Sequence, residues 1–198
     1  YTIQGIDTCC GALVNNTARD GRPFFLSAYH CGPSASNAPS MVVYWQYENS
    51  YCRMPGSAAS GRPGDGDLRQ FNSGAIFRAR REVSDFALVE LDDPVAPAVN
   101  AYYAGWDRGS ADATMAACVH HPALAEKRIS FELDRTRTTE FYGSASPGDG
   151  THIRVADWDY GTTEHGSSGS PLFNQDGCII GQLHGGAAAC GNDEPDWF

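Results

Sequence analysis

The chain of 198 residues lacks several features that would assign it to other classes of protein. No apolar run approaches the length of a membrane span, and no internal repeat occurs. The 14 Lys and Arg are outnumbered by 24 Asp and Glu, and a net charge of −10 disfavours a nucleic-acid partner. The 7 cysteines include no Cys-x-x-Cys pair, which disfavours a zinc or redox site. We therefore expect no membrane or nucleic-acid partner, no metal and no other cofactor.

Long helix-forming runs are also scarce, whereas the 22 glycines and 11 prolines are typical of a turn-rich all-β chain. A chain of this length can bury a sizeable core, as one domain or as two small fused barrels. The predicted strands cover residues 12–14, 24–28, 41–45, 74–80, 86–91, 115–120, 128–133, 152–155, 171–174 and 179–184. Residues 92–97 form a stiff, proline-containing linker, and we place the boundary between two barrels there.

The run Gly166-Ser167-Ser168-Gly169-Ser170-Pro171 has the form of a serine nucleophile loop. Glycines around a serine let the backbone turn tightly and aim neighbouring N–H groups at one point. That geometry suits a tetrahedral oxyanion and exposes the serine hydroxyl for attack on a carbonyl. By itself the run is equally compatible with a Gly/Ser turn between two strands.

Two upstream segments carry the groups that such a serine needs. An apolar stretch from residue 24 ends at His30, beside Cys31, and Asp85 opens a second apolar stretch. A serine needs a base to remove its proton, and the base needs a buried carboxylate to fix its tautomer. We therefore predict a catalytic triad of His30, Asp85 and Ser168, with the backbone N–H groups of Gly166 and Ser168 as the oxyanion hole.

Further segments narrow the interpretation to one branch of enzymes that use this chain order of His, Asp and Ser. They include Ser84-Asp85-Phe86 and His120-His121-Pro122, together with residues 11–17, 42–45, 104–107, 126–130, 166–171 and 181–186. On these segments, which span most of its length, the chain resembles the bacterial lysyl endopeptidases, a branch of the trypsin-like serine proteases.

The resemblance implies an all-β fold of two Greek-key, six-stranded antiparallel β-barrels. Residues 1–95 would form the barrel that carries His30 and Asp85, and residues 96–198 the barrel that carries Ser168 and the specificity pocket. The implied function is a secreted serine endopeptidase that cleaves protein or peptide substrates after lysine, or after arginine, through an acyl-enzyme intermediate. We expect a monomer. The residue before the nucleophile is Ser167, where zymogen-activated trypsins have an aspartate that pairs with a newly cut N-terminus.

The resemblance also implies the residues that bind substrate. Asp196 matches the carboxylate that binds the lysine of the substrate, although by itself it is one more acid in the acidic residues 192–196. His184 lies on the strand that would pair with the substrate backbone, and Gly185 would leave the pocket mouth open. An aromatic residue stacks on the substrate-strand histidine in the family, and Tyr142 lies in the matching region. Thr162 is a further pocket candidate.

Cysteine usage agrees with an oxidising compartment. The resemblance implies a disulfide between Cys9 and Cys31, which would staple the histidine loop, and a second between Cys118 and Cys178. Cys52 and Cys190 match positions that bond to a more N-terminal segment in the family. Cys10 departs from the family pattern, and the odd count leaves at least one thiol unpaired.

The remaining histidines have structural interpretations. Adjacent residues on a strand point to opposite faces, so His120 and His121 are expected to pack rather than to bind one metal ion. His152 is expected at the surface of its strand. His165 is equally compatible with solvent exposure and with substrate contact.

Two other functions remain open. Glutamyl endopeptidases share a Gly-x-Ser-Gly-Ser loop and use a histidine in the pocket, so His184 and Thr162 are compatible with an acidic preference, whereas Asp196 would repel an acidic side chain. An inactive, truncated or protease-like binding protein is the third alternative. The chain begins at Tyr1 without a signal peptide, as a mature or trimmed product would. It stops at Phe198, so we expect a second barrel truncated at its C-terminus.

Overall fold

A computed structural model describes residues 1–7, 9–54, 57–60, 62–109, 111–192 and 194–198. Within them the chain forms short β-strands and three 3-10 helices, and it forms no α-helix. No helix in these ranges has the length and apolarity needed to cross a membrane. The elements in chain order are β1 (Thr2–Ile3), β2 (Ile6–Asp7), β3 (Ala12–Val14), β4 (Phe24–Ala28), η1 (Ala38–Ser40), β5 (Val42–Tyr44), β6 (Phe71–Ser73), β7 (Ala75–Arg81), β8 (Phe86–Leu91), η2 (Pro97–Val99), β9 (Ala116–His120), η3 (Pro122–Leu124), β10 (Arg128–Glu132), β11 (Arg137–Thr139), β12 (His152–Val155), β13 (Pro171–Asn174), β14 (Ile179–Gln182), β15 (Gly185–Gly186) and β16 (Asp196–Trp197).

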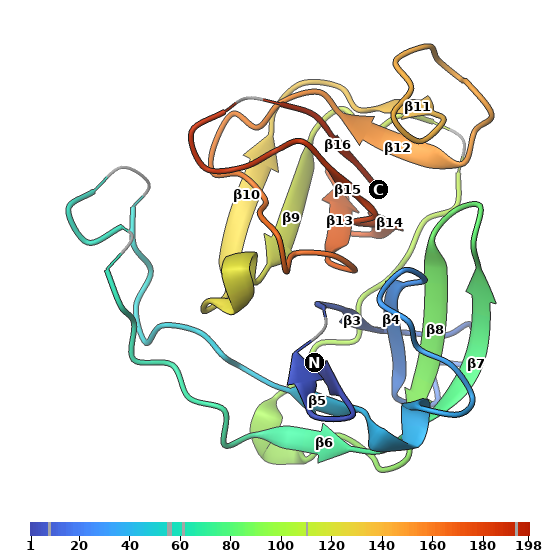
Figure 1. Cartoon of the computed structure of the whole chain (residues 1–198), viewed down its shortest axis with the longest axis vertical. Helices are drawn as coiled ribbons and strands as arrows, with labels where there is room; N and C mark the ends of the chain where they lie inside the picture. The colour runs from blue at the N-terminus through green and yellow to red at the C-terminus, as the bar shows by residue number, and fades with distance from the viewer. Residues whose placement is uncertain (8, 55–56, 61, 110, 193) are drawn as a thin grey trace.

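The paired strands form four antiparallel, four-stranded sheets. Strands from the first half of the chain make the sheets β2-β1-β5-β6 and β3-β4-β8-β7, and strands from the second half make β10-β9-β13-β14 and β11-β12-β16-β15. Figure 1 shows the two halves as a lower part, blue to green, and an upper part, yellow to red. The predicted all-β class is confirmed. Closure into two six-stranded barrels and the boundary near residue 95 stay predictions.

The strands that lead to His30 and Asp85 are the middle pair of their sheet. Strand β4 lies between β3 and β8, and Ala28 is paired with Phe86 at the end nearest the two residues. Four of the five residues of β4 are buried, as expected of a central strand with an almost wholly apolar sequence. The edge strand β7 carries three arginines among its exposed positions, and charge of this kind discourages pairing with another chain.

Each half has its own apolar core, and a third cluster joins the halves. Phe25, Met41 and Val89 are buried in the first core, and Val155 and Leu172 in the second. The joining cluster contains Val14 and Leu26 from the first half and Ala104 and Ile179 from beyond the linker. Burial of such side chains contributes about 1.5–3 kcal/mol each, so the third cluster holds the serine-bearing half against the histidine-bearing half.

Most predicted strands are present with small shifts at their ends. The bounds are as predicted for β3, β4, β8, β12 and β13. The prediction missed six strands of only two or three residues: β1, β2, β6, β11, β15 and β16. Such segments are too short for an alternating pattern to distinguish them from loops.

Candidate active site

His30 and Asp85 are in direct contact. The His30 Nδ1–H donates to Asp85 Oδ2 at 2.7 Å, and the His30 backbone N–H donates to Oδ1 at 2.8 Å. Asp85 is only 1% exposed, whereas the His30 ring is open to solvent. The carboxylate therefore fixes both the position of the ring and its Nδ1–H tautomer, which leaves Nε2 as the basic nitrogen.

Backbone conformation and a disulfide hold this pair in place. Asp85 has φ of 50°, a left-handed conformation that costs a non-glycine residue about 1–3 kcal/mol. Its carbonyl accepts a hydrogen bond from the Tyr29 N–H at 2.7 Å, which ties it to the segment before His30. The predicted disulfide between Cys9 and Cys31 is present and anchors the residue that follows His30.

The loop that carries Ser168 packs against the first half of the chain. Gly166 and Gly169 have φ of 92° and 79°, a region that glycine occupies without strain. A Cβ atom on Gly169 would lie 2.4 Å from the Cys10 carbonyl oxygen and 2.5 Å from Ser27 Oγ. Any larger residue would therefore push the loop away from β4, the strand that leads to His30.

Cys10 bonds to the same loop twice. Its backbone N–H donates to the Ser168 carbonyl at 2.8 Å, and its thiol donates to the Gly166 carbonyl at 3.2 Å. These bonds place the half-buried Ser168 beside the segment that carries the Cys9–Cys31 disulfide. Within the described residues no hydrogen bond joins Ser168 to His30. Catalytic hydrogen bonds are often long in enzymes without substrate, so this geometry is compatible with a triad.

The predicted oxyanion donors have no partner within the described part of the chain. The N–H groups of Ser167, Gly169 and Ser170 all donate to backbone carbonyls, whereas those of Gly166 and Ser168 donate to none. These two donors are therefore available to a ligand.

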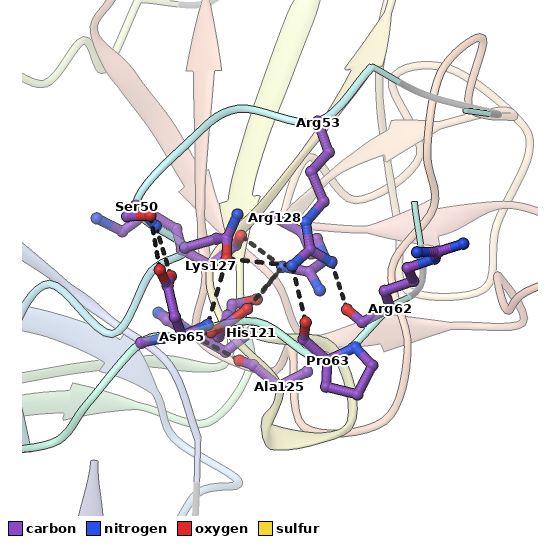
Figure 2. A network of polar contacts seen from close by, with 12 residues as sticks. Ser50, Arg53, Arg62, Pro63, Asp65, His121, Ala125, Lys127 and Arg128 are labelled. Carbon is purple, nitrogen blue, oxygen red and sulfur yellow. Dashed lines mark hydrogen bonds and ion pairs between the residues drawn. The ribbon is translucent and has the colours of Figure 1, made fainter. Parts of the chain in front are cut away.

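A neighbouring turn orients the Gly166 peptide. The Ala123 N–H donates to the His165 carbonyl at 2.7 Å. Because carbonyl and N–H point in opposite directions across a trans peptide, the Gly166 N–H faces away from Ala123. The turn is closed by the His121 ring, which donates from Nδ1 to the Ala125 carbonyl at 2.9 Å (Figure 2).

His184 extends the site on the side of His30. The two rings stack at 5.4 Å between centroids, and His184 Nε2 lies 3.9 Å from Asp85 Oδ1. Burial lowers the pKa of His184, and the nearby Asp85 carboxylate opposes that shift. The donor atoms of His30, Asp85 and His184 lie within 4.8 Å of one another, a spacing that a metal ion could bridge. The direct bond between His30 and Asp85 already uses one of these donor pairs.

Two expectations about the aromatic surroundings of His184 are wrong. The residue stacked on His184 is Phe141, at 3.7 Å and 7° between the rings, and not Tyr142. Tyr142 has a left-handed φ of 58°, which turns it onto Trp197, and it is 64% exposed. His152 is not at the surface: it is buried and its Nε2 is bonded to His184 Nδ1 at 2.9 Å.

Asp196 is buried at the end of the chain, 1% exposed. It lies on β16, between β12 and β15, where Gly186 is its partner. Its Oδ2 accepts hydrogen bonds from Thr163 Oγ1 at 2.5 Å and from Trp158 Nε1 at 2.9 Å. Burial raises the pKa of Asp196, and the two donors oppose that shift. The alternative of a solvated acid is therefore wrong for Asp196; Asp193 of the same segment lies outside the described residues.

Of the other predicted pocket residues, Gly185 lies on β15, which is paired with the strand of Asp196. A Cβ atom on Gly186 would lie 2.5 Å from Asp196 Oδ1, so the second carboxylate oxygen faces the glycine strand β15. Gly185 has φ of 149°, and no atom lies within 4 Å of the position that a Cβ would take there, which agrees with an open pocket mouth. Thr162 precedes the donor Thr163, and its carbonyl accepts a hydrogen bond from Ser130.

Comparison with known proteins identifies the family of the chain. The family described as the lysyl endopeptidase C-terminal domain matches residues 1–198. The chain belongs to this family. It is 28% identical over 188 residues to the lysyl endopeptidase of Pseudomonas aeruginosa, a match that covers 92% of this chain but 38% of that protein. The chain thus spans less than half the length of this curated relative.

Solved structures of proteases share the fold. A Glu endopeptidase in complex with MPD superposes with a TM-score of 0.58 at 17% identity, over 99% of this chain and 80% of that chain. The thermostable serine protease AL20 from an extremophilic microorganism gives a TM-score of 0.54 at 16% identity, over 96% and 82% of the two chains. At these identities the likeness establishes a trypsin-like protease fold.

The second disulfide that the family resemblance implies, between Cys118 and Cys178, is not formed. Cys118 and Cys178 are both free thiols. Cys118 is fully buried in the core of the second half, among Val155 and Leu172, and burial raises the pKa of its thiol. The Cys178 sulfur instead faces Gly105 in the connecting segment, 3.6 Å from the position that a Cβ would take there. Cys10, Cys52 and Cys190 are free as well.

Proposed function

We propose that the chain is a secreted serine endopeptidase that hydrolyses peptide bonds after lysine, with His30, Asp85 and Ser168 as its catalytic residues. The observation that carries this proposal is the buried Asp85 carboxylate bonded to both the ring and the backbone of His30. Membership of the lysyl endopeptidase family supports it. The Cys9–Cys31 disulfide supports an oxidising, extracellular location.

The reaction begins when Ser168 Oγ attacks the carbonyl carbon of the scissile peptide and His30 Nε2 takes the serine proton. Asp85 stabilises the imidazolium that forms. The N–H groups of Gly166 and Ser168 stabilise the oxyanion, which is typically worth about 3–4 kcal/mol for each donor. His30 then gives its proton to the leaving amine. Water, activated by His30, hydrolyses the acyl-enzyme and regenerates Ser168.

Asp196 provides the basis for lysine preference. A buried carboxylate attracts an ammonium group strongly, because both charges lose competing water when the substrate binds. Thr163 and Trp158 hold Oδ2, so the charge is oriented before substrate arrives. Arginine would also pair with this carboxylate. A glutamyl side chain would be repelled, which makes an acidic preference the weaker alternative despite the fold shared with a Glu endopeptidase.

The two halves would each close into a six-stranded barrel, with the substrate bound between them and contributions from both. The joining cluster of Val14, Leu26, Ala104 and Ile179 supports such a fixed arrangement of the halves. A shared fold with trypsin-like proteases supports it as well.

A panel of peptides tests the specificity. Three peptides that differ only in Lys, Arg or Glu before the scissile bond are incubated with the chain and with the Asp196→Asn variant. We expect the lysyl peptide to be cleaved fastest, and Asp196→Asn to lower its kcat/KM about 100- to 1000-fold, since a buried charge loses its partner. The matched control is Glu194→Gln, which removes an exposed charge from the same segment and should leave kcat/KM unchanged within about twofold. Preferred cleavage after Glu would overturn the proposed specificity.

A further inference from the structure

A chain of buried hydrogen bonds runs behind residues 166–169, which carry the two proposed oxyanion donors and which we call the oxyanion loop. The Glu164 N–H bonds to Ser167 Oγ at 3.2 Å, and Ser167 Oγ is 2.8 Å from His120 Nδ1. On the other side of the ring, His120 Nε2 is 3.1 Å from Ser130 Oγ, which donates to the Thr162 carbonyl at 3.0 Å. Ser167 and Ser130 are 0% exposed and His120 is 1% exposed.

The donors and acceptors allow one arrangement of protons. Ser130 Oγ uses its only hydrogen on the Thr162 carbonyl, so it accepts from His120 Nε2–H. His120 Nδ1 then carries the lone pair and accepts the Ser167 hydroxyl hydrogen. Ser167 Oγ in turn accepts from the Glu164 N–H. Each hydrogen is used once, and the ring is a neutral imidazole with its proton on Nε2.

A second proton on the His120 ring would disrupt this arrangement of hydrogen bonds. With both ring nitrogens protonated, the Ser167 hydroxyl would lose its acceptor in a site without water access. The surroundings disfavour that second proton: burial lowers the pKa of His120 to about 4, and His121 and Arg128 act in the same direction. The neutral ring is therefore the form present at neutral pH.

Ser167 stands between the two proposed oxyanion donors, Gly166 and Ser168. Its side chain points into the protein, toward His120 on β9, whereas the N–H groups on either side are unpartnered in the described structure. Holding this side chain fixes the direction of the peptide that carries the Ser168 N–H, and it fixes the Gly166–Ser167 peptide, which adjoins the one that carries the Gly166 N–H. The oxyanion loop is thus anchored from behind by a side chain of a different strand.

We propose that His120 is a positioning residue for the oxyanion hole, which acts through Ser167 to keep the Gly166 and Ser168 N–H groups aimed at the reacting carbonyl. The inference rests on the proposed protease function. It gives a role to a histidine that does not touch substrate, and it makes Ser130 the residue that sets the tautomer of His120.

Kinetics on three variants test the role. His120→Leu removes both hydrogen bonds, His120→Asn retains an amide oxygen near the position of Nδ1, and Ser130→Ala removes the partner of Nε2. Active sites are counted by endpoint reaction with a fluorophosphonate, so that kcat refers to competent molecules only. We expect His120→Leu to lower kcat about 10- to 100-fold at nearly unchanged KM, His120→Asn to recover most of that loss, and Ser130→Ala to lie between them.

A peptide aldehyde, which forms a tetrahedral adduct with the nucleophile, provides a second readout. Its inhibition constant should rise in proportion to the loss of kcat, because both report on stabilisation of the oxyanion. Unchanged kcat and unchanged aldehyde affinity in His120→Leu would overturn the inference. So would a loss that appears wholly in KM.

Nitrogen NMR of the unmodified protein tests the proton arrangement without any variant that might fail to fold. At neutral pH His120 should carry its proton on Nε2 and a bare lone pair on Nδ1; the opposite tautomer, or a doubly protonated ring, would overturn the inference. A wild-type chain that is folded but reacts with no fluorophosphonate would instead refute the proposed protease function. The two failures are therefore distinguishable.

Discussion

Replacing His120 by asparagine should remove part of the acid sensitivity of the folded state. In the folded chain the pKa of His120 is lowered from 6.5 to about 4, mainly because the ring is buried. The unfolded chain therefore binds a proton at His120 below pH 6.5, whereas the folded chain does not bind it until the pH approaches 4. Above pH 6.5 His120 is neutral in both states and does not lower the stability of the folded chain. As the pH falls from 6.5 towards 4, the unfolded chain gains a proton that the folded chain cannot take up, and the folded chain loses stability.

The size of the effect follows from the two pKa values. Each unit of difference corresponds to about 1.4 kcal/mol, so the window from 6.5 to about 4 corresponds to about 3 kcal/mol. The ring is 1% exposed, so screening by solvent reduces this value little. A loss of this size is a large fraction of the stability of a typical domain.

Urea unfolding at a series of pH values between 7.5 and 4.5 measures the effect. His120→Asn is expected to be less stable than the wild type at pH 7.5, because one hydrogen bond is lost. As the pH falls, the difference should shrink by about 2–3 kcal/mol, since only the wild type retains the titrating ring. Other titrating groups are common to both proteins and cancel in the difference. A difference that stays constant over this range would refute the reasoning about a buried, neutral His120.

Three further predictions concern the proposed active site. Asp85→Asn should lower kcat by about 10⁴-fold with little change in KM, because an amide holds the wrong tautomer of the histidine; steady-state kinetics on a lysyl peptide measure it, and a loss under tenfold would contradict the assigned role. Phe141→Ala should lower the free energy of unfolding by about 1–3 kcal/mol more than Tyr142→Ala, since only Phe141 stacks on the histidines; equal losses in urea unfolding would contradict this packing. Thr163→Val removes a donor to Asp196 and should raise the pKa of that carboxyl further, so the acid limb of kcat/KM for lysyl peptides should move to higher pH; an unmoved limb would show that Asp196 does not bind the substrate.

Much of the fold could be predicted from local sequence, because its central strands are apolar and bounded by turns. Strands β4 and β8 are largely apolar, with one polar residue each, and their predicted bounds agree with the observed ones. The two-residue strands β15 and β16 could not be predicted in this way. Their pairing depends on tertiary contacts, since β16 is held between β12 and β15.

The site shows the same division between local and tertiary information. His30 and Asp85 could be recognised because each has a distinctive position at the end of an apolar strand, and the structure brings them together. The sequence could not distinguish Phe141 from Tyr142, which are adjacent aromatics; the left-handed backbone at Tyr142 decides which one faces His184. Nothing local indicated that His152 is buried, because its partner is distant in sequence.

The buried partners of Asp196 could not be predicted either. In the sequence nothing marks Trp158 as a partner of a carboxylate, and the pocket candidate is Thr162, whereas its neighbour Thr163 makes the bond to Asp196. An indole N–H and a hydroxyl become informative only when a carboxylate is known to be buried beside them. For Cys118 the family resemblance gives the wrong expectation: it implies a disulfide with Cys178, and Cys118 is instead a free thiol packed in the core.

The central claim, that Ser168 is a nucleophile activated by His30, is tested most directly by mass spectrometry after reaction with a fluorophosphonate. We predict a single adduct that maps to Ser168, forms at a rate that falls strongly in His30→Ala, and is absent from Ser168→Ala. Samples quenched with acid at successive times give the rate, and circular dichroism verifies that each protein is folded. No adduct on the folded wild type, or an adduct on another serine that persists in Ser168→Ala, would contradict the account.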